Sequence, residues 1–344
     1  MNVLWSGVDT LEASFMGCLA PELPPYLDEL KGRAQDEERP LAMTLGDYPL
    51  SMSASGLKPW RWLLKGDDFH LRLSAARNVP TASVRLLSVA LATYGHEGLY
   101  ALACDVVGSV GDVLEAGASR VDVFADLQGF APTADDMAGI VCPALYRGVH
   151  LCGAVPQTFQ YGKGALVVRV YNKSAELASS HKSWLREVWA TCEGYSPELD
   201  VWRVEAQFRR EALRSYGFET VAEVFANLPD LFASGLAWCE LRTPDGANKT
   251  RWARSLIWDE LCAQSFGGVA LPRLKQLTSV AAMDRVVPQA LGLLISGSAH
   301  LGITDPDEAF SLLAARGREY LAVRGQDFGD RVRMRQVELR GTST

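Results

Sequence analysis

Polar and apolar residues alternate along the first ninety residues and again in three later segments, which predicts an antiparallel sheet. Short alternating runs broken by Gly, Pro or Asp lie between Leu4 and Tyr94, and such runs are typical of strands joined by hairpins. An acidic segment with several prolines, residues 21–40, interrupts them, and we expect it to form a surface excursion or a short helix. The later strands are predicted over 119–127, 165–173 and 201–210.

Helical spacing of apolar residues appears between the two sets of strands and dominates the end of the chain. It predicts helices over 97–114, 221–239, 252–263, 271–294 and 306–324. No internal sequence repeat is evident. The pattern therefore predicts an α+β fold with two domains, a mixed α/β domain at residues 1–216 and a mostly helical domain at 217–344.

Composition and charge narrow the class of protein. With 48% hydrophobic and 22% charged residues, the 344-residue chain reads as globular. The N-terminus has no basic residue before its apolar positions and no segment reads as a membrane span, so we expect a cytoplasmic protein that does not contact a membrane. A net charge of −7 excludes a protein that coats nucleic acid by charge alone. Local excess of bases, six against three acids in 241–275, still leaves room for an anionic partner.

The three later strands each present one charged face. Residues two apart in a strand share a face. In each of these strands one face is apolar throughout and the other carries the charged residues. The charged faces hold Arg120, Asp122, Phe124 and Asp126 on the first strand, Arg169 and Tyr171 on the second, and Arg203, Glu205, Gln207 and Arg209 on the third.

If these strands share a sheet, the charged faces meet in one patch. Asp122, Asp126 and Glu205 would then repel one another, and a divalent cation relieves such repulsion. Oxygen ligands suit Mg²⁺ or Mn²⁺. The alternative is a solvated face on which arginines and acids pair across strands, each pair contributing about 0.2–1 kcal/mol.

Tyr171 has two interpretations within that patch. Tyrosines on strands commonly serve as amphipathic packing residues. A phenol is also a nucleophile when a cation or a base assists its ionisation, and Lys173 with a bound metal would supply that assistance. A tyrosine beside metal-binding carboxylates suits attack on a phosphodiester.

Three motifs in this region resemble those of a known family. Residues 158–177, TFQYGKGALVVRVYNKSAEL, combine a short hairpin with an R-x-Y-x-K-x-x-E signature; RVDVFADL matches an R-x-D-x-x-x-D strand, and VWRVEAQFRRE an R-x-E strand followed by a basic helix. In this order they resemble the trans-acting replication initiation factors of rolling-circle plasmids and filamentous phages. The resemblance covers roughly residues 3–217.

The resemblance implies a role for each matching residue. Tyr171 would be the nicking nucleophile that forms a 5′-phosphotyrosine and leaves a 3′-OH, with Lys173 and Arg169 steadying the scissile phosphate or the phenolate. Asp122, Glu205 and Asp126 would be the metal ligands. The implied fold is a relaxase-like antiparallel sheet with helices on one face, followed by a mostly helical C-terminal part. The chain has no His-x-His pair, so a metal would rest on carboxylates.

From these observations we expect a metal-dependent, site-specific DNA nickase and strand transferase that starts rolling-circle replication of a plasmid, phage or integrated element. Its expected partner is origin DNA, single-stranded or melted, and a helicase and a second copy of the chain are further candidates. Two alternatives remain open: a DNA-binding regulator that keeps the scaffold without catalysis, and a carboxylate-metal phosphodiesterase that uses water.

Overall fold

The computed structural model describes residues 1–179, 184–271 and 280–333. Its internal contacts divide the chain into two compact units, Met1–Leu274 and Lys275–Thr344. The first unit contains the sheet and the predicted site. The described residues of the second include the helices α11 (Val280–Leu301) and α12 (Pro306–Val323).

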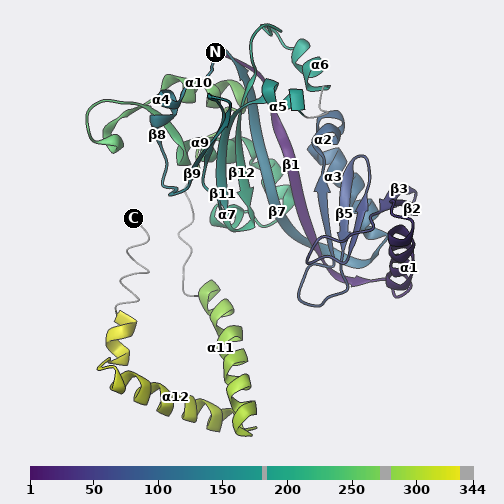
Figure 1. The fold of residues 1–344 in the computed structure, drawn as a ribbon, viewed down its shortest axis with the longest axis vertical. Helices are drawn as coiled ribbons and strands as arrows, with labels where there is room; N and C mark the ends of the chain where they lie inside the picture. The colour runs from purple at the N-terminus through teal and green to yellow at the C-terminus, as the bar shows by residue number, and fades with distance from the viewer. Residues whose placement is uncertain (180–183, 272–279, 334–344) are drawn as a thin grey trace. The chain divides into compact units, whose positions relative to one another are not determined.

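An antiparallel sheet of 11 strands forms the centre of the first unit (Figure 1). Its strand order is β2-β3-β4-β5-β6-β1-β7-β12-β11-β10-β9. The strands are β1 (Asn2–Leu19), β2 (Leu41–Leu45), β3 (Tyr48–Met52), β4 (Trp62–Lys65), β5 (Phe69–Leu73), β6 (Ala82–Leu86), β7 (Gly111–Gln128), β9 (Arg147–Cys152), β10 (Val155–Tyr161), β11 (Leu166–Asn172) and β12 (Trp202–Arg209).

The strand order is symmetric about the central pair β1 and β7. Both strands are 18 residues long and pair from Asn2↔Gln128 to Leu19↔Gly111. On one side of this pair lie β6, β5 and β4, and on the other β12, β11 and β10. Each half thus takes its central strand first along the chain and its flanking strands later, so the topology repeats although the sequence does not.

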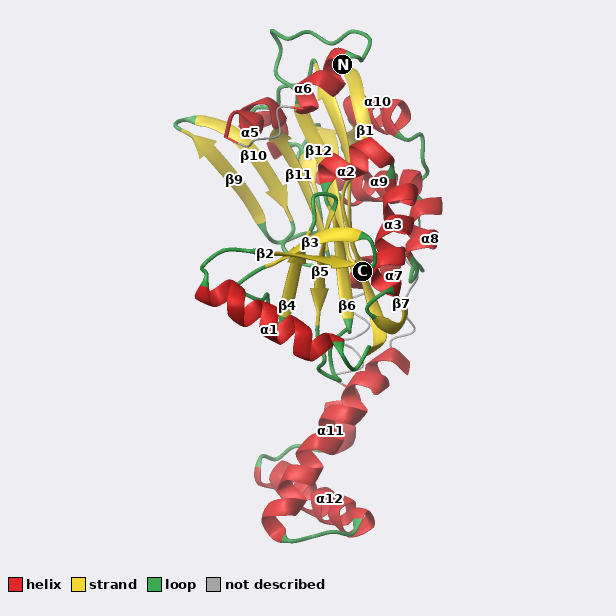
Figure 2. Ribbon diagram, turned by 90° about the vertical axis from the view of Figure 1, so that its right-hand side faces the viewer, coloured by secondary structure: helices red, strands yellow, loops and turns green. Residues whose placement is uncertain are grey.

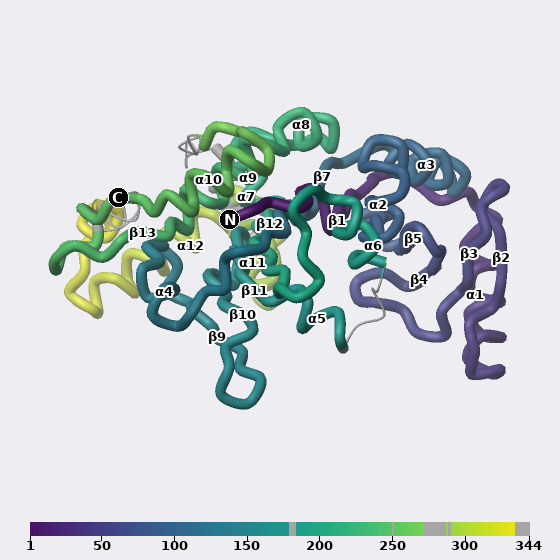
Figure 3. Tube along the Cα trace, turned by 90° about the horizontal axis from the view of Figure 1, so that it is seen from above, coloured from purple at the N-terminus to yellow at the C-terminus, as the bar shows by residue number. Residues whose placement is uncertain are grey.

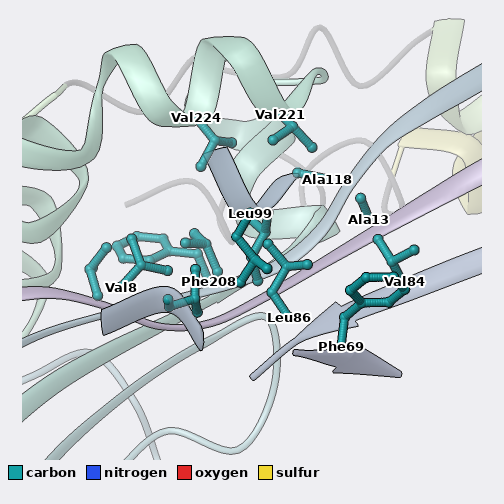
Figure 4. Packing of buried hydrophobic residues seen from close by; sticks show 14 of the residues in the cluster. Val8, Ala13, Phe69, Val84, Leu86, Leu99, Ala118, Phe208, Val221 and Val224 are labelled. Carbon is teal, nitrogen blue, oxygen red and sulfur yellow. The ribbon is translucent and has the colours of Figure 1, made fainter. Parts of the chain in front are cut away.

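One face of the sheet is apolar across both halves and carries most of the helices. Figure 2 shows α3, α8, α9 and α10 along one side of the sheet, and Figure 4 shows Phe69 and Val84 of the first half in one cluster with Phe208 of the second. Gly235 of α9 allows a close approach, because a Cβ there would lie 2.6 Å from the Cβ of Ala206. The helices on this face are α2 (Ser88–Tyr94), α3 (His96–Gly108), α7 (Arg210–Ser215), α8 (Val221–Ala226), α9 (Leu228–Trp238) and α10 (Leu256–Ser265).

Three further helices lie elsewhere on the sheet. α1 (Leu23–Asp36) packs against β2 and β3 at one edge, as Figure 3 shows. α5 (Lys173–Ser179) and α6 (Trp184–Ala190) cover one end of the opposite, polar face, where Leu177, Leu185 and Trp189 bury a small cluster with Leu4 and Val201. The rest of the polar face carries the predicted charged side chains.

A minor three-stranded sheet flanks the main one. It consists of β8 (Ile140–Val141), β13 (Glu240–Thr243) and β14 (Ala253–Arg254), with α4 (Ala134–Ala138) and a 3₁₀ turn at Lys249–Arg251 nearby in sequence. Within the described residues, no helix combines the length and apolarity needed to cross a bilayer.

The predicted fold class is confirmed: an α+β fold, a large antiparallel sheet and a helical C-terminal part. Two boundaries differ from the prediction. The helix expected over 97–114 ends at Gly108 and β7 begins at Gly111, because β1 is long enough to pair with those residues. α8, α9 and α10 follow residue 217 and pack on the sheet, so the first compact unit extends to Leu274 rather than to 216. Of the helix expected over 271–294, residues 272–279 lie outside the described part.

Candidate active site on the polar face

The three charged strands lie side by side, and their register aligns the predicted residues in rows. β11 pairs with β12 and β12 with β7, so that Arg169 lies opposite Glu205. Tyr171 lies opposite Arg203, and Arg203 opposite Asp126. The sheet therefore brings together the side chains that the alternation placed on one face.

Tyr171 and Glu205 contact each other directly. The Tyr171 hydroxyl donates a hydrogen bond to Glu205 Oε2 at 3.0 Å. The other oxygen, Glu205 Oε1, accepts one from Arg169 Nη1 at 3.0 Å, and the same Nη1 donates to Gln207 Oε1 at 3.1 Å. Arg169 thus orients the Glu205 carboxylate, which accepts the hydrogen bond from the Tyr171 hydroxyl.

The surroundings keep the Tyr171 phenol protonated. Burial, reinforced by the charge of Glu205, raises the pKa of Tyr171 well above its usual value. The residue nevertheless remains partly exposed. Any reaction in which the hydroxyl acts as a nucleophile must remove its proton during the attack, and the bonded carboxylate is the nearest acceptor.

Lys173 lies behind the tyrosine ring, at the start of α5. Asn172 Oδ1 accepts a hydrogen bond from the amide of Ala175 at 2.9 Å, which stabilises the change from strand to helix at this point. The Lys173 ammonium is 5.4 Å from the Tyr171 ring centroid and 2.5 Å from Glu176 Oε2. The lysine is only 2% exposed, and burial lowers the pKa of Lys173.

Asp126 is committed to a buried ion pair. Arg203 Nε and Nη2 donate to its two oxygens at 2.6 and 2.8 Å, and the indole of Trp189 donates to Oδ2 at 3.0 Å. Arg203 Nη1 also bonds Asp9 at 2.6 Å. Asp126 is 0% and Arg203 1% exposed. Its geometry therefore favours a structural role over the predicted metal ligation, since its oxygens already face protein donors.

Asp122 pairs with Arg120 and lies one row away from Glu205. Nε and Nη2 of Arg120 both donate to the carboxylate of Asp122. On β12 the register partner of Asp122 is Gln207, two residues beyond Glu205. Burial, together with the charge of Glu205, raises the pKa of Asp122 to about 7, although Arg120 opposes the shift. Two like charges are therefore held close in a poorly solvated place.

Two carboxylates fit a divalent cation only in part. Among the described residues no group of three or more His, Cys, Asp or Glu side chains is arranged to hold a metal ion. Mg²⁺ commonly uses one or two carboxylates and completes its shell with water and substrate phosphate. Asp122 and Glu205 match that number of carboxylates, and a cation would relieve their mutual repulsion. It would have to displace donors, because Arg120 binds both oxygens of Asp122, and Arg169 and Tyr171 bind those of Glu205.

Sequence reasoning missed two residues of this region. Asp9 reaches Arg203 from β1, and the alternation in VDTLEASF was the available signal, because it places Asp9 in a strand. Trp189 reaches Asp126 from α6, and no local pattern indicates this contact.

Comparisons with known proteins return likenesses among solved structures. No protein-family model matches the sequence, and no curated protein matches it either. Among solved structures, the chain is similar to the rolling circle replication initiator protein from Geobacillus stearothermophilus, with a TM-score of 0.46 and 14% sequence identity over 78% of this chain and 98% of that chain. The chemistry of the site therefore rests on its own residues and distances.

Proposed function

We propose that the protein cuts and rejoins single-stranded DNA through a covalent phosphotyrosine on Tyr171, and that it thereby initiates rolling-circle replication. The hydrogen bond of 3.0 Å between the Tyr171 hydroxyl and Glu205 carries this proposal. It joins a partly exposed nucleophile to a fixed proton acceptor, which is the arrangement that nucleophilic catalysis requires. The motifs of 120–126, 169–176 and 203–205 support the same reading by resemblance.

The proposed step conserves atoms and charge. The Tyr171 oxygen attacks the phosphorus of a phosphodiester, and its proton passes to Glu205. A bond forms between phosphorus and the tyrosine oxygen while the bond to the 3′ oxygen breaks. The leaving 3′ oxygen takes up a proton from solvent, to which Glu205 releases the one it received. The reverse reaction, attack by a 3′-OH on the phosphotyrosine, restores a phosphodiester and releases Tyr171.

The neighbouring cations have distinct positions in this reaction. Arg169 orients Glu205 and, being partly exposed, is available to the phosphate. Lys173 stabilises negative charge on the ring side of Tyr171 once the proton has left. Asp122 and Glu205 would hold Mg²⁺ or Mn²⁺, which supplies polarisation of a phosphoryl oxygen when bound.

Covalent capture of labelled DNA by Tyr171 tests the proposal. The full-length protein is incubated with Mn²⁺ and a pool of single-stranded oligonucleotides of random sequence, labelled at the 3′ end. We expect an adduct that survives denaturing electrophoresis with the wild type and is absent with Tyr171→Phe. Tyr146→Phe changes an exposed tyrosine on another part of the chain and serves as the matched control.

The other outcomes contradict the proposal in different ways. Cleavage without an adduct indicates a phosphodiesterase that uses water. Binding without cleavage indicates a regulator that uses the same face. An adduct that persists in Tyr171→Phe indicates another nucleophile.

A further inference from the structure

A row of aligned residues, most of them basic, crosses the polar face beyond the Tyr171 site. On neighbouring strands β5, β6, β1, β7 and β12, the register places these residues directly opposite one another: His70, Arg85, Glu12, Arg120 and Arg209. Three of the five are arginines and one is an acid. The row belongs to both halves of the sheet and passes over the central pair.

Two of these arginines have no short contact with a carboxylate among the described residues. Arg209 is exposed, and within the described residues no carboxylate lies within ion-pair distance of it. Arg85 is 39% exposed and its Nε is 3.8 Å from Glu12, whose carboxylate has its short contact, 2.8 Å, with Arg72. Arg120 is held by Asp122. The side chains of the row that are available to an anion are therefore Arg209 and Arg85, whose contact with Glu12 is the longer one.

The surroundings of the first-half end of the row are also basic. Lys65 is the register partner of His70, and Arg72 lies in the next row of β5. Burial, and after it the charges of Lys65, Arg85 and Arg72, lower the pKa of His70. The side chains that face His70 therefore contribute positive potential, and Glu12 is the carboxylate that opposes it in the row.

The row lies at a distance suited to a strand that occupies the Tyr171 site. Arg209 is four residues from Glu205 on β12, or about 14 Å at 3.4 Å per residue. Arg85 is three strands from Arg209, or about 14 Å at 4.8 Å per strand. Repeated cations at such spacing match the repeated phosphates of a nucleic-acid backbone, whereas a single small anion would use one of them.

We propose that Arg209 and Arg85 bind the sugar-phosphate backbone of single-stranded DNA and lead it from the Tyr171 site onto the first half of the sheet. This inference rests on the proposed function and adds a path for the strand. It assigns the first half a binding role that does not depend on sequence-specific contacts.

Binding measurements separate this path from the chemistry. Fluorescence anisotropy is recorded in EDTA with labelled oligothymidylate of about 24 nucleotides, a length above the usual site size of a single binding fold. We compare the wild type with Arg85→Ala/Arg209→Ala, and with Arg33→Ala/Arg39→Ala, which removes the same charge from exposed positions around α1. A charge-preserving Arg85→Lys/Arg209→Lys variant reports whether loss of charge or loss of packing is responsible.

We expect Arg85→Ala/Arg209→Ala to bind at least tenfold more weakly than the wild type. The slope of log K against log salt should become shallower by about 1.4, because each lost phosphate contact of a single strand contributes about 0.7. The lysine variant should retain the slope, and Arg33→Ala/Arg39→Ala should resemble the wild type. An unchanged slope in Arg85→Ala/Arg209→Ala, an equal loss in the α1 control, or tighter binding to duplex than to single strand would overturn the path.

The adduct assay keeps the two proposals apart. If the wild type forms no adduct while the arginine variants lose affinity as expected, the nicking proposal fails and the path remains. If the adduct forms but the arginine variants bind normally, the path fails and the nicking proposal remains.

Discussion

The two halves of the sheet share a topology and an apolar face but carry different chemistry on the polar face. In the second half, β11 and β12 present Tyr171, Arg169 and Glu205 in contact. In the first half, the topologically equivalent strands β5 and β6 present His70, Arg72 and Arg85, with no tyrosine or carboxylate among them. The apolar face carries the shared core, so the polar face is free to differ. The residues of the proposed reaction thus lie in one half, while basic residues extend across both.

The halves also differ in how deeply their ion pairs are buried. The pair of Arg203 and Asp126 in the second half is 1% and 0% exposed, whereas Arg72 and Glu12 in the first half are 8% and 16% exposed. α6 accounts for the difference, because Trp189 lies over Asp126. We therefore expect the stability of the second half to depend on its buried charges keeping their partners.

Removing Arg203 should have the largest effect on stability. Arg203→Met leaves Asp126 buried with the Trp189 indole as its remaining donor, and breaking a buried pair from one side costs about 3–5 kcal/mol. Arg72→Met in the first half should cost less, because Glu12 is partly solvated and keeps Arg85 nearby. Urea denaturation followed by circular dichroism measures both free energies of unfolding. Equal losses would remove the proposed difference between the halves.

Replacing the acid of each half should separate reaction from binding. Glu205→Gln loses the acceptor for the Tyr171 proton, and loss of a general base commonly lowers rates by about 100-fold or more. Glu12→Gln removes an acid from the basic row, so adduct formation should stay near the wild-type rate while affinity for oligothymidylate rises. Rates of adduct formation and anisotropy measure the two effects. Comparable loss of rate in both variants would assign Glu205 a structural role.

The sequence predicted the part of this comparison that depends on local patterns. Alternation in 119–127 and 201–210 identifies which residues share the polar face, and the register then needs only the strand order to bring Arg203 beside Asp126. Contacts made from outside the strands do not leave such a pattern. Trp189 comes from a helix 63 residues away from Asp126, and its indole adds a third donor to the carboxylate that Arg203 already pairs with.

The repeated topology was equally hidden. The two halves place different residues on their polar faces and have different connections, so the sequence alone offered no repeat to detect. The apolar faces of both halves are hydrophobic, but many unrelated strands are too, so this likeness does not reveal a repeat. The repeat becomes visible in the strand order, in which the two halves meet at the pairing of β1 with β7.

The smallest of these effects is the pH dependence that Asp122 contributes to stability. With its pKa raised to about 7, the folded protein binds more protons than the unfolded chain between about pH 4 and pH 7, so the free energy of unfolding falls as pH rises through that window. Asp122→Asn stays neutral and lacks this dependence. Between pH 5 and pH 8 without metal, we expect the wild type to lose about 2.7 kcal/mol relative to this variant, at 1.36 kcal/mol per pH unit over the two units below the raised pKa. His70 and His96, whose pKa values burial lowers, change stability in the opposite direction, but they are present in both proteins and cancel in the difference.

A difference that stays constant from pH 5 to pH 8 would mean that Arg120 keeps Asp122 ionised throughout. Arg120 would then already offset the repulsion from Glu205, and that repulsion would no longer argue for a cation at this site.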